Sequence, residues 1–205
     1  YVTDFLSRAR AGGIPVPDLA FRRALNNLRN QVNYAPDFTR DENDGGEALA
    51  YQLLVLAREG EAQMGDLRYY ADTKGGDFAT PLAMAQIGAA LAAYGDPTRA
   101  DVMFTRAGTL LRADLAGPEP QTLRADFGTH LRDAAAVLTL AVEAGSNALD
   151  SATLISQIEA VDTPRSTQES AWTLLAAKSL VSDGAVAGLS VNGAPSQGPM
   201  VRVLQ

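Results

Sequence analysis

The sequence predicts an all-α fold in which α-hairpins stack in two layers. Ala and Leu, both strong helix formers, supply 36 and 25 of the 205 residues. Segments that are apolar nearly all round alternate with amphipathic ones. A helix that is apolar on every side must be buried on every side, whereas an amphipathic helix lies at a surface, so the alternation indicates an inner and an outer layer. Either an open solenoid or a closed α/α ring satisfies this pattern.

Glycines mark the predicted helix ends, because a left-handed C-terminal cap favours a residue without Cβ. They occur at Gly12-Gly13, Gly60, Gly95, Gly145 and Gly184. With the start signals described next, they predict helices over about residues 1–12, 18–33, 45–59, 64–73, 81–94, 97–113, 129–144, 148–160 and 167–182, and a short one at 121–126.

Polar residues that can cap a helix mark the predicted starts. Two pairs have the spacing of a capping box, and two more sites put a capping oxygen before a Pro at the first helical position. These are Asp44 with Glu47, Ser166 with Glu169, Thr80-Pro81 and Asp96-Pro97, and Asn147 opens a further segment in the same way.

The composition of each segment predicts its layer. Segment 18–33 has one apolar stripe opposite a face of Arg and Asn, so we expect it on the outside. Segments 81–94, 134–141 and 171–180 are apolar nearly all round, so we expect them in the inner layer. The helix over 166–180 is predicted to be among the most buried.

The pattern changes to a period of two after Gly184. Ala187, Leu189 and Val191 alternate with small or polar residues, Asn192-Gly193 offers a tight turn, and 200–204 is again strand-like. A lone two-stranded piece is marginally stable. We therefore divide the chain into a helical domain over 1–184 and a β-strand tail over 185–205 that leads into an adjoining β domain.

Composition excludes several classes of function. The formal charge of -7 disfavours nucleic acid or an anionic membrane as the main partner. The absence of Cys excludes disulfides, thiolate nucleophiles and Cys-based metal sites within these residues. No apolar run approaches the roughly 18 residues of a membrane span. The chain opens without Met inside an apolar pattern, so we expect a fragment of a larger protein.

His130, the only histidine, is the first candidate catalytic residue. It could be a general base oriented by Asp126 or Asp133. It could instead be a surface or inter-helix residue at a helix start, with Asp133 capping or pairing locally. No second His, no Cys and no reactive Ser motif accompanies it, so the second interpretation is favoured and we predict no catalytic residue.

Other candidate sites are weaker. Residues 41–46 resemble a calcium loop, but a Gly stands in the fifth ligand slot and Gln52 replaces the bidentate Glu, so we predict no metal site. The Gly pairs are not followed by Lys-Ser/Thr, so we predict no phosphate or cofactor site. A glycosidase ring needs two facing carboxylates, and the inner helices carry almost no acid, with Glu143 the main candidate. Trp172 and Tyr69-Tyr70 could be ligand platforms, although packing is favoured.

Several stretches together resemble one family. Ser-Thr-Gln-Glu-Ser-Ala-Trp-Thr-Leu-Leu at 166–175 resembles a helix near the end of the thioester-bearing helical domain of the alpha-2-macroglobulin and complement proteins, the bacterial branch above all. Similar stretches follow in the same order as in those proteins. They are Tyr-Val-Thr-Asp-Phe-Leu at 1–6, Gly-Asp-Leu-Arg-Tyr at 65–69, Phe-Ala-Thr-Pro-Leu-Ala at 78–83 and Gly-Thr-His-Leu-Arg-Asp at 128–133.

The resemblance implies an α/α toroid, truncated at its N-terminus and inserted in a β-sandwich domain. It implies a structural domain of a protease inhibitor that collapses around its target, in a periplasmic or extracellular parent anchored as a lipoprotein. In many members a Cys-Gln thioester acylates a lysine of the protease and releases the Cys thiol, but Cys-x-Glu-Gln is absent here, so no catalytic residue is carried over. The expected partners are proteases, through the parent, and adjacent β-sandwich domains. A free-standing α-solenoid that binds peptides or proteins, and an α/α-toroid enzyme, remain alternatives.

Overall fold

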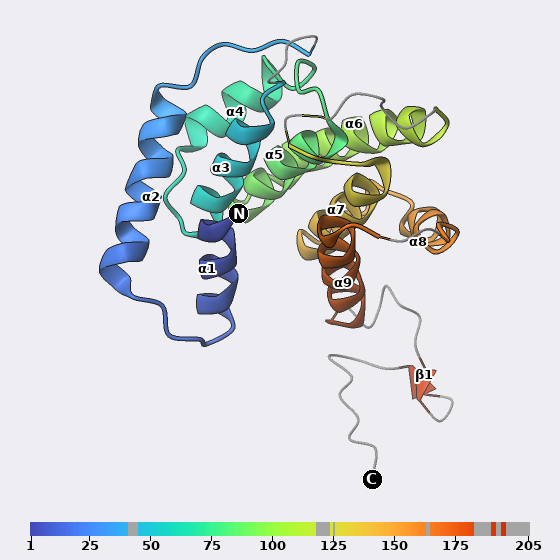
Figure 1. Ribbon diagram of the computed structural model, residues 1–205. Coiled ribbons are helices and arrows are strands. Elements are labelled where there is room, and N and C mark those ends of the chain that lie inside the picture. The colour runs from blue at the N-terminus through green and yellow to red at the C-terminus, as the bar shows by residue number, and fades with distance from the viewer. Residues whose placement is uncertain are drawn as a thin grey trace.

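The computed structural model describes residues 1–40, 45–117, 124, 126–162, 165–182, 190–191 and 194–195. Nine α-helices follow one another along this part of the chain (Figure 1). They are α1 (Val2–Ala11), α2 (Asp18–Asn33), α3 (Glu47–Arg58), α4 (Met64–Asp72), α5 (Pro81–Ala93), α6 (Pro97–Leu115), α7 (His130–Glu143), α8 (Ser151–Glu159) and α9 (Thr167–Ser182).

Most of the predicted helix ends are confirmed. Thr80 accepts a hydrogen bond from the amide of Ala83, and Asp96 accepts one from the amide of Arg99. Ser166 and Glu169 form the reciprocal capping box, and the predicted C-terminal glycines at 13, 60, 95 and 145 all have positive φ. Gly184 lies outside the described residues.

Four boundaries differ from the sequence prediction. The N-cap of α3 is Gly46 with φ 82°, and Asp44, which was expected there, lies outside the described residues. Asp150, not Asn147, caps α8. Helix α6 runs two residues beyond 113. Of the short helix expected over 121–126, only residues 124 and 126 are described, and neither is helical.

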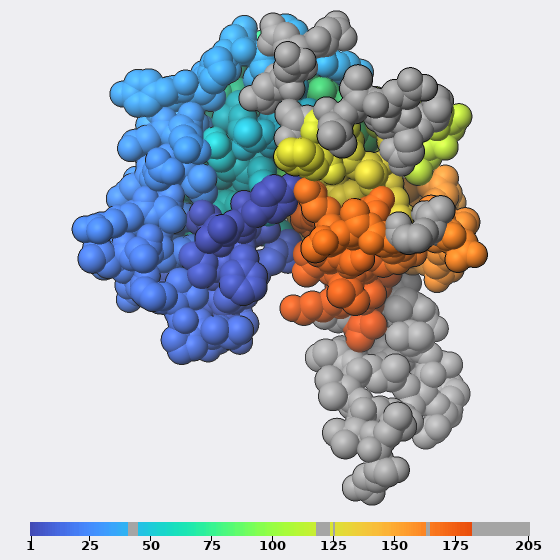
Figure 2. Space-filling view, in the orientation of Figure 1, coloured from blue at the N-terminus to red at the C-terminus, as the bar shows by residue number. Residues whose placement is uncertain are grey.

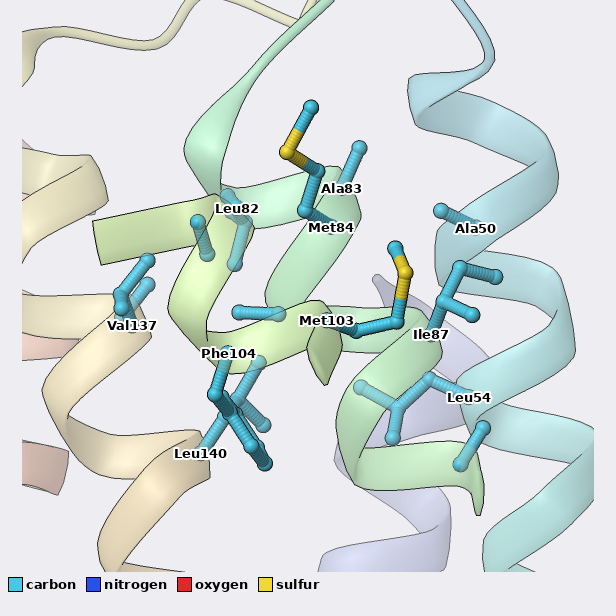
Figure 3. Close-up of a cluster of buried hydrophobic side chains, with 14 of the residues drawn as sticks. Ala50, Leu54, Leu82, Ala83, Met84, Ile87, Met103, Phe104, Val137 and Leu140 are labelled. Atoms are coloured by element: carbon cyan, nitrogen blue, oxygen red, sulfur yellow. The ribbon is translucent and has the colours of Figure 1, made fainter. Parts of the chain in front are cut away.

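The helices form an inner and an outer layer, as predicted. Helices α3, α5, α7 and α9 pack side by side in that order, while α2, α4, α6 and α8 lie against the outside of their neighbours. Helices α5 and α7 are buried on nearly every side, in agreement with their composition. Figure 3 shows the core on both sides of α5, where Ile87 faces Ala50 and Leu54 of α3, and Phe104 of α6 lies beside Leu140 of α7.

Contacts of α1 with α9 and α7 bring the two ends of the helical array together. The Tyr1 hydroxyl donates to the side chain of Gln168 at 3.3 Å, and the Arg8 guanidinium lies 6.0 Å from the centre of the Trp172 ring. Arg8 also donates to Glu143 of α7 at 2.8 Å. The described chain therefore forms an α/α toroid, one of the two arrangements that the sequence allowed, in which α1 and α9 meet through these few side chains.

Helix α9 is less buried than its composition predicted. Trp172, Ala176 and Ser179 are buried, whereas Leu174 is 71% and Val181 39% exposed. Among the described elements α9 packs chiefly against α7, so only one of its faces is covered. The prediction that this helix is among the most buried is wrong for the described chain, in which α5 and α7 have that place.

The tail contains a short antiparallel pair of strands, β1 (Ser190–Val191) and β2 (Ala194–Pro195). The turn expected at Asn192-Gly193 and the strand expected at 200–204 lie outside the described residues. No helix in the described part of the chain has both the length and the apolar character needed to cross a membrane.

Candidate functional site

A pocket of about 470 Å³ opens at one end of the toroid, where the inner helices begin. Its walls come from the start of α1, from α3 and α5, from α2, α7 and α9, and from the segment that precedes α7. Figure 2 shows this region as a hollow between α1 in dark blue, α2 in blue and the yellow residues of α7 and the segment before it, with cyan atoms of α3 beneath. The pocket thus gathers residues that are far apart in the sequence.

The pocket wall is largely apolar and aromatic. Tyr1, Tyr51 and Trp172 contribute rings, and Leu82 and Val55 contribute aliphatic side chains. Burial raises the pKa of Tyr51, and the neighbouring Asp4 carboxylate, which accepts its hydroxyl hydrogen at 2.8 Å, raises it further. The Tyr51 phenol therefore stays protonated.

Four charged side chains form a closed cluster at one side of the pocket. Asp126 accepts hydrogen bonds from Arg132 at 2.5 Å and from Arg124 at 2.8 Å. Asp133 is paired with Arg124 and Arg132, each at 2.8 Å. Arg132 is only 1% exposed, so its charge needs these partners to be tolerated.

The cluster fixes the protonation of Asp126. Burial by itself raises the pKa of this carboxyl, but the charges and hydrogen bonds of Arg132 and Arg124 outweigh burial and hold the pKa below its ordinary value. Asp126 is therefore an anion at neutral pH and is unsuited to donate a proton. Its negative charge is already matched by the two guanidinium groups.

The structure places His130 at the first position of α7, where it is buried. Thr129, not Asp133, caps this helix by accepting from the amide of Arg132. The two carboxylates that could have oriented His130 are both ion-paired with arginines, so Asp133 pairs locally as the favoured interpretation expected.

The acidic residues of the inner layer are more numerous than the sequence analysis expected. Glu47 and Asp126 line the pocket, and Asp4 and Asp133 are buried nearby in the ring. Glu143 does not line the pocket, because it lies at the far end of α7. The inner helices therefore carry more acid than Glu143 alone, because Glu47 lies on α3 and Asp133 on α7, whereas Asp4 lies on α1 and Asp126 precedes α7.

Glu143 belongs to a second ionic cluster. It pairs with Arg8 at 2.8 Å and with Arg58 at 2.9 Å, and Arg58 also pairs with Asp4 at 2.5 Å. The cluster ties α1 to α3 and α7. Its contacts indicate a structural role for Glu143.

The candidate aromatic platforms have different surroundings. Trp172 is 5% exposed and forms part of the pocket wall. Tyr70 packs near Phe38 and Phe78, with ring centres 6.4 and 6.5 Å away, and Tyr69 is half-exposed at the edge of Tyr70. Of the three, Trp172 is the one that lines this pocket.

Sequence reasoning missed Gln86, whose side chain lines the pocket from α5 and is 3% exposed. It stands within a run of Ala, and no local pattern distinguishes it. Among the described residues no group of three or more His, Cys, Asp or Glu side chains is arranged to hold a metal ion. The calcium-like loop at 41–46 lies mostly outside the described residues.

Comparison with known proteins gives the family context of this ring. No family model matches the chain. The alpha-2-macroglobulin of Escherichia coli strain K12 is 33% identical over 148 residues, which is 70% of the chain and 9% of the relative. The alpha-2-macroglobulin of Xylella fastidiosa strain Temecula1 is 31% identical over 145 residues, 68% of the chain and 8% of the relative.

This chain is homologous to bacterial alpha-2-macroglobulins. Salmonella alpha-2-macroglobulin reacted with methylamine matches 86% of the chain with a TM-score of 0.70 and 32% identity, over 12% of that protein. Native E. coli alpha-2-macroglobulin matches 88% with a TM-score of 0.72 and 30% identity, also over 12%. A structure of the E. coli protein from domain MG7 to the C-terminus matches 88% of the chain with a TM-score of 0.71 and 31% identity, over 29% of that structure.

The homology concerns one region of the alpha-2-macroglobulins. The chain spans less than a tenth of the length of the curated relatives it matches. The match to the structure that begins at MG7 places the corresponding region in the C-terminal part of the alpha-2-macroglobulin polypeptide.

Proposed function

We propose that this chain is a structural, non-catalytic part of a bacterial alpha-2-macroglobulin-like protease inhibitor of broad spectrum, which traps host or environmental proteases. The observation that carries the proposal is the homology with alpha-2-macroglobulins over more than two thirds of the chain. Residues 1–184 are then part of the thioester-type helical domain, and residues 185–205 lead into the adjoining β-sandwich domain.

The packing of the ring supports a scaffold role. Helices α5 and α7 are rich in Ala, and small side chains let neighbouring helices approach closely. At Gly88 a Cβ would lie 3.1 Å from the carbonyl oxygen of Ala100 and 3.3 Å from the side chain of Met103, so α5 and α6 are nearly in backbone contact. A core packed in this way resists deformation and keeps water out. A reactive acyl group in a neighbouring segment would need such a shell.

The parent protein is proposed to lie in the periplasm or outside the cell, anchored as a lipoprotein. Its partners would be proteases and, within the same polypeptide, the β-sandwich domains next to the helical domain. The chain's own residues do not support an enzyme, because Asp126, one of the two pocket carboxylates, is held as an anion by two arginines.

The test is protease capture by the full-length parent. The purified parent is mixed with a protease, with and without prior methylamine treatment, and the mixture is separated by size. We expect protease activity to move to the size of the parent, and amine sensitivity to report a thioester. The chain over 1–205 is the control and should retain no protease. A parent that leaves the protease at its free size contradicts the proposal.

A further inference from the structure

The outward side of α2 has an unusual composition for a solvent-exposed helix surface. Helix α2 contains neither Lys nor Glu, and its one acidic residue lies in the first turn. Residues three or four apart share one side of a helix, and on α2 that side lies opposite the buried Phe21, Leu25 and Val32. Figure 2 shows α2, in blue, along one edge of the molecule. The α2 face consists of the exposed residues Leu19, Arg22, Arg23, Asn27, Asn30 and Tyr34.

Two arginines of the α2 face differ from the other arginines that the structure describes. Arg22 and Arg23 form no hydrogen bond or ion pair with any described residue. Every other described arginine has such a partner, as Arg99 of α6 has in Asp72 at 3.0 Å. In a chain with a net charge of -7, the α2 face therefore presents two positive charges that no described acidic side chain matches.

Asn27 and Asn30 are poor residues for the middle of an exposed helix. Asn has a low helix propensity, because its side-chain amide competes with the backbone for hydrogen bonds. Neither side chain forms a hydrogen bond with another described residue, so no contact within the described chain offsets this cost. Each amide does supply two donors and an acceptor to the α2 face. The α2 face thus keeps hydrogen-bonding groups that make the helix less stable.

The two ends of the α2 face expose large apolar side chains. Tyr34, at the C-cap of α2, is 86% exposed, and Leu19 in the first turn is 59% exposed. Tyr and Arg are among the residues that contribute most to binding at protein interfaces, where Lys and Glu are depleted. The α2 face therefore has the composition of a contact with another polypeptide surface, and its charge requires that this surface be acidic.

We propose that the α2 face binds an acidic surface of the parent polypeptide that lies outside this chain. Carboxylates of that surface pair with Arg22 and Arg23, whose planar guanidinium groups suit carboxylates. Polar groups beside the carboxylates bond to Asn27 and Asn30. The curated relatives are more than ten times longer than the region they share with this chain, so a parent of that kind has ample further surface. The inference rests on the proposed function in taking the chain as part of such a parent, but protease trapping does not enter it.

The accessibility of Arg22 provides the assay. Phenylglyoxal, which modifies accessible guanidinium groups, is added to the full-length parent and to the chain over 1–205, and the modification of Arg22 is followed by mass spectrometry. In the chain over 1–205 Arg22 is exposed and should react readily. In the parent it should react about tenfold more slowly, because only the fraction of molecules with an uncovered α2 face reacts.

A charge reversal and added salt test whether the partner surface is acidic. In the parent, Arg23→Glu should bring the modification rate of Arg22 up to the rate that the same variant shows in the chain over 1–205. Lys178→Glu is the matched control, because it reverses one exposed charge on α9 and should leave Arg22 protected. Raising the salt concentration from about 0.05 to about 0.5 M should also speed the reaction of Arg22 in the parent, since salt screens exposed charges.

The asparagines give an independent test. The double variant Asn27→Ala with Asn30→Ala should raise the thermal unfolding midpoint of the chain over 1–205 by about 2–4 °C, because Ala has the higher helix propensity. In the parent the same variant should make Arg22 more reactive, because the amides no longer hold the partner surface. A merely solvated helix surface would show the first effect without the second.

Three outcomes would overturn the proposal. Equal reaction rates of Arg22 in the parent and in the chain over 1–205 would mean that the α2 face is solvated in both. Protection that survives both salt and Arg23→Glu would mean that the partner surface is not acidic. Protection that grows with the concentration of the chain over 1–205 alone would make the occupant a second copy of this chain. A parent that fails to capture protease would contradict the proposed function and leave these rates to decide the present proposal.

Discussion

Replacing Asp4 with alanine should loosen α1 from the rest of the ring. The Asp4 side chain is 8% exposed and accepts hydrogen bonds from the Tyr51 hydroxyl at 2.8 Å and from Arg58 at 2.5 Å. Removing one member of a buried ion pair costs about 3–5 kcal/mol, because the remaining charge stays buried without its partner. Part of this cost is avoided, because the Arg58 side chain is 19% exposed and keeps its ion pair with Glu143 at 2.9 Å. We therefore expect a loss of about 2–3 kcal/mol in the free energy of unfolding.

The measurement is urea unfolding of the chain over 1–205, followed by far-ultraviolet circular dichroism. Asp72→Ala is the control, because Asp72 also pairs with an arginine, Arg99 at 3.0 Å, but is 53% exposed. Exposed pairs contribute about 0–1 kcal/mol. The double variant Asp4→Leu with Arg58→Met should recover most of the lost stability, since it removes both charges. If Asp4→Ala and Asp72→Ala cost the same, the buried cluster does not hold α1 in place.

Three further outcomes are expected. In urea unfolding, Gly46→Ala should lower the free energy of unfolding by about 2–4 kcal/mol, and the control Gly95→Ala by about 1 kcal/mol. Both glycines have positive φ, but a Cβ at position 46 would lie 2.6 Å from the Phe38 ring, whereas a Cβ at position 95 has no atom within contact distance. Equal losses in the two variants would exclude the clash with Phe38. Burial alone raises the pKa of Glu169, but hydrogen bonds from Thr129 and Ser166 outweigh it and hold the pKa below its ordinary value. The stability difference between wild type and Glu169→Gln should therefore be full above the unfolded-state pKa of about 4.3 and vanish as the pH falls through the lower folded-state pKa; a difference that persists at pH 2 contradicts this. Amide hydrogen exchange measured by mass spectrometry should be slower in α5 and α7 than in α9, and the reverse order would contradict the burial described here.

Local signals made most helix boundaries predictable. A helix start is marked by a Thr or Asp before Pro, whose side chain pairs with an amide of the first turn. A helix end is marked by a Gly after an apolar segment. Both signals involve only a few adjacent residues, so they can be read from the sequence. One boundary was wrong because two capping residues lie close together in the sequence. Asn147 and Asp150 are both good capping residues three positions apart, and only packing decides that α8 begins after Asp150.

Burial and the pocket could not be predicted in the same way. The composition of α9 reports its own apolar side chains but not which neighbours cover them, so the exposure of Leu174 was missed. The pocket joins Gln86, Arg132 and Trp172, which come from three helices, and no spacing rule connects them. The ion pairs of Asp4 and Glu143 likewise depend on arginines that are distant in sequence.

The closure of the ring has a consequence for how the chain folds. Contacts between successive helices join residues close in sequence, whereas Arg8 and Glu143 are 135 positions apart and Tyr1 and Gln168 are 167 apart. Bringing such distant residues together has the largest entropic cost of loop closure, and their contacts offset this cost only after the intervening helices have assembled. Refolding should therefore gain its helical signal before α1 meets α9, and variants at this seam should mainly speed unfolding while leaving the folding rate nearly unchanged.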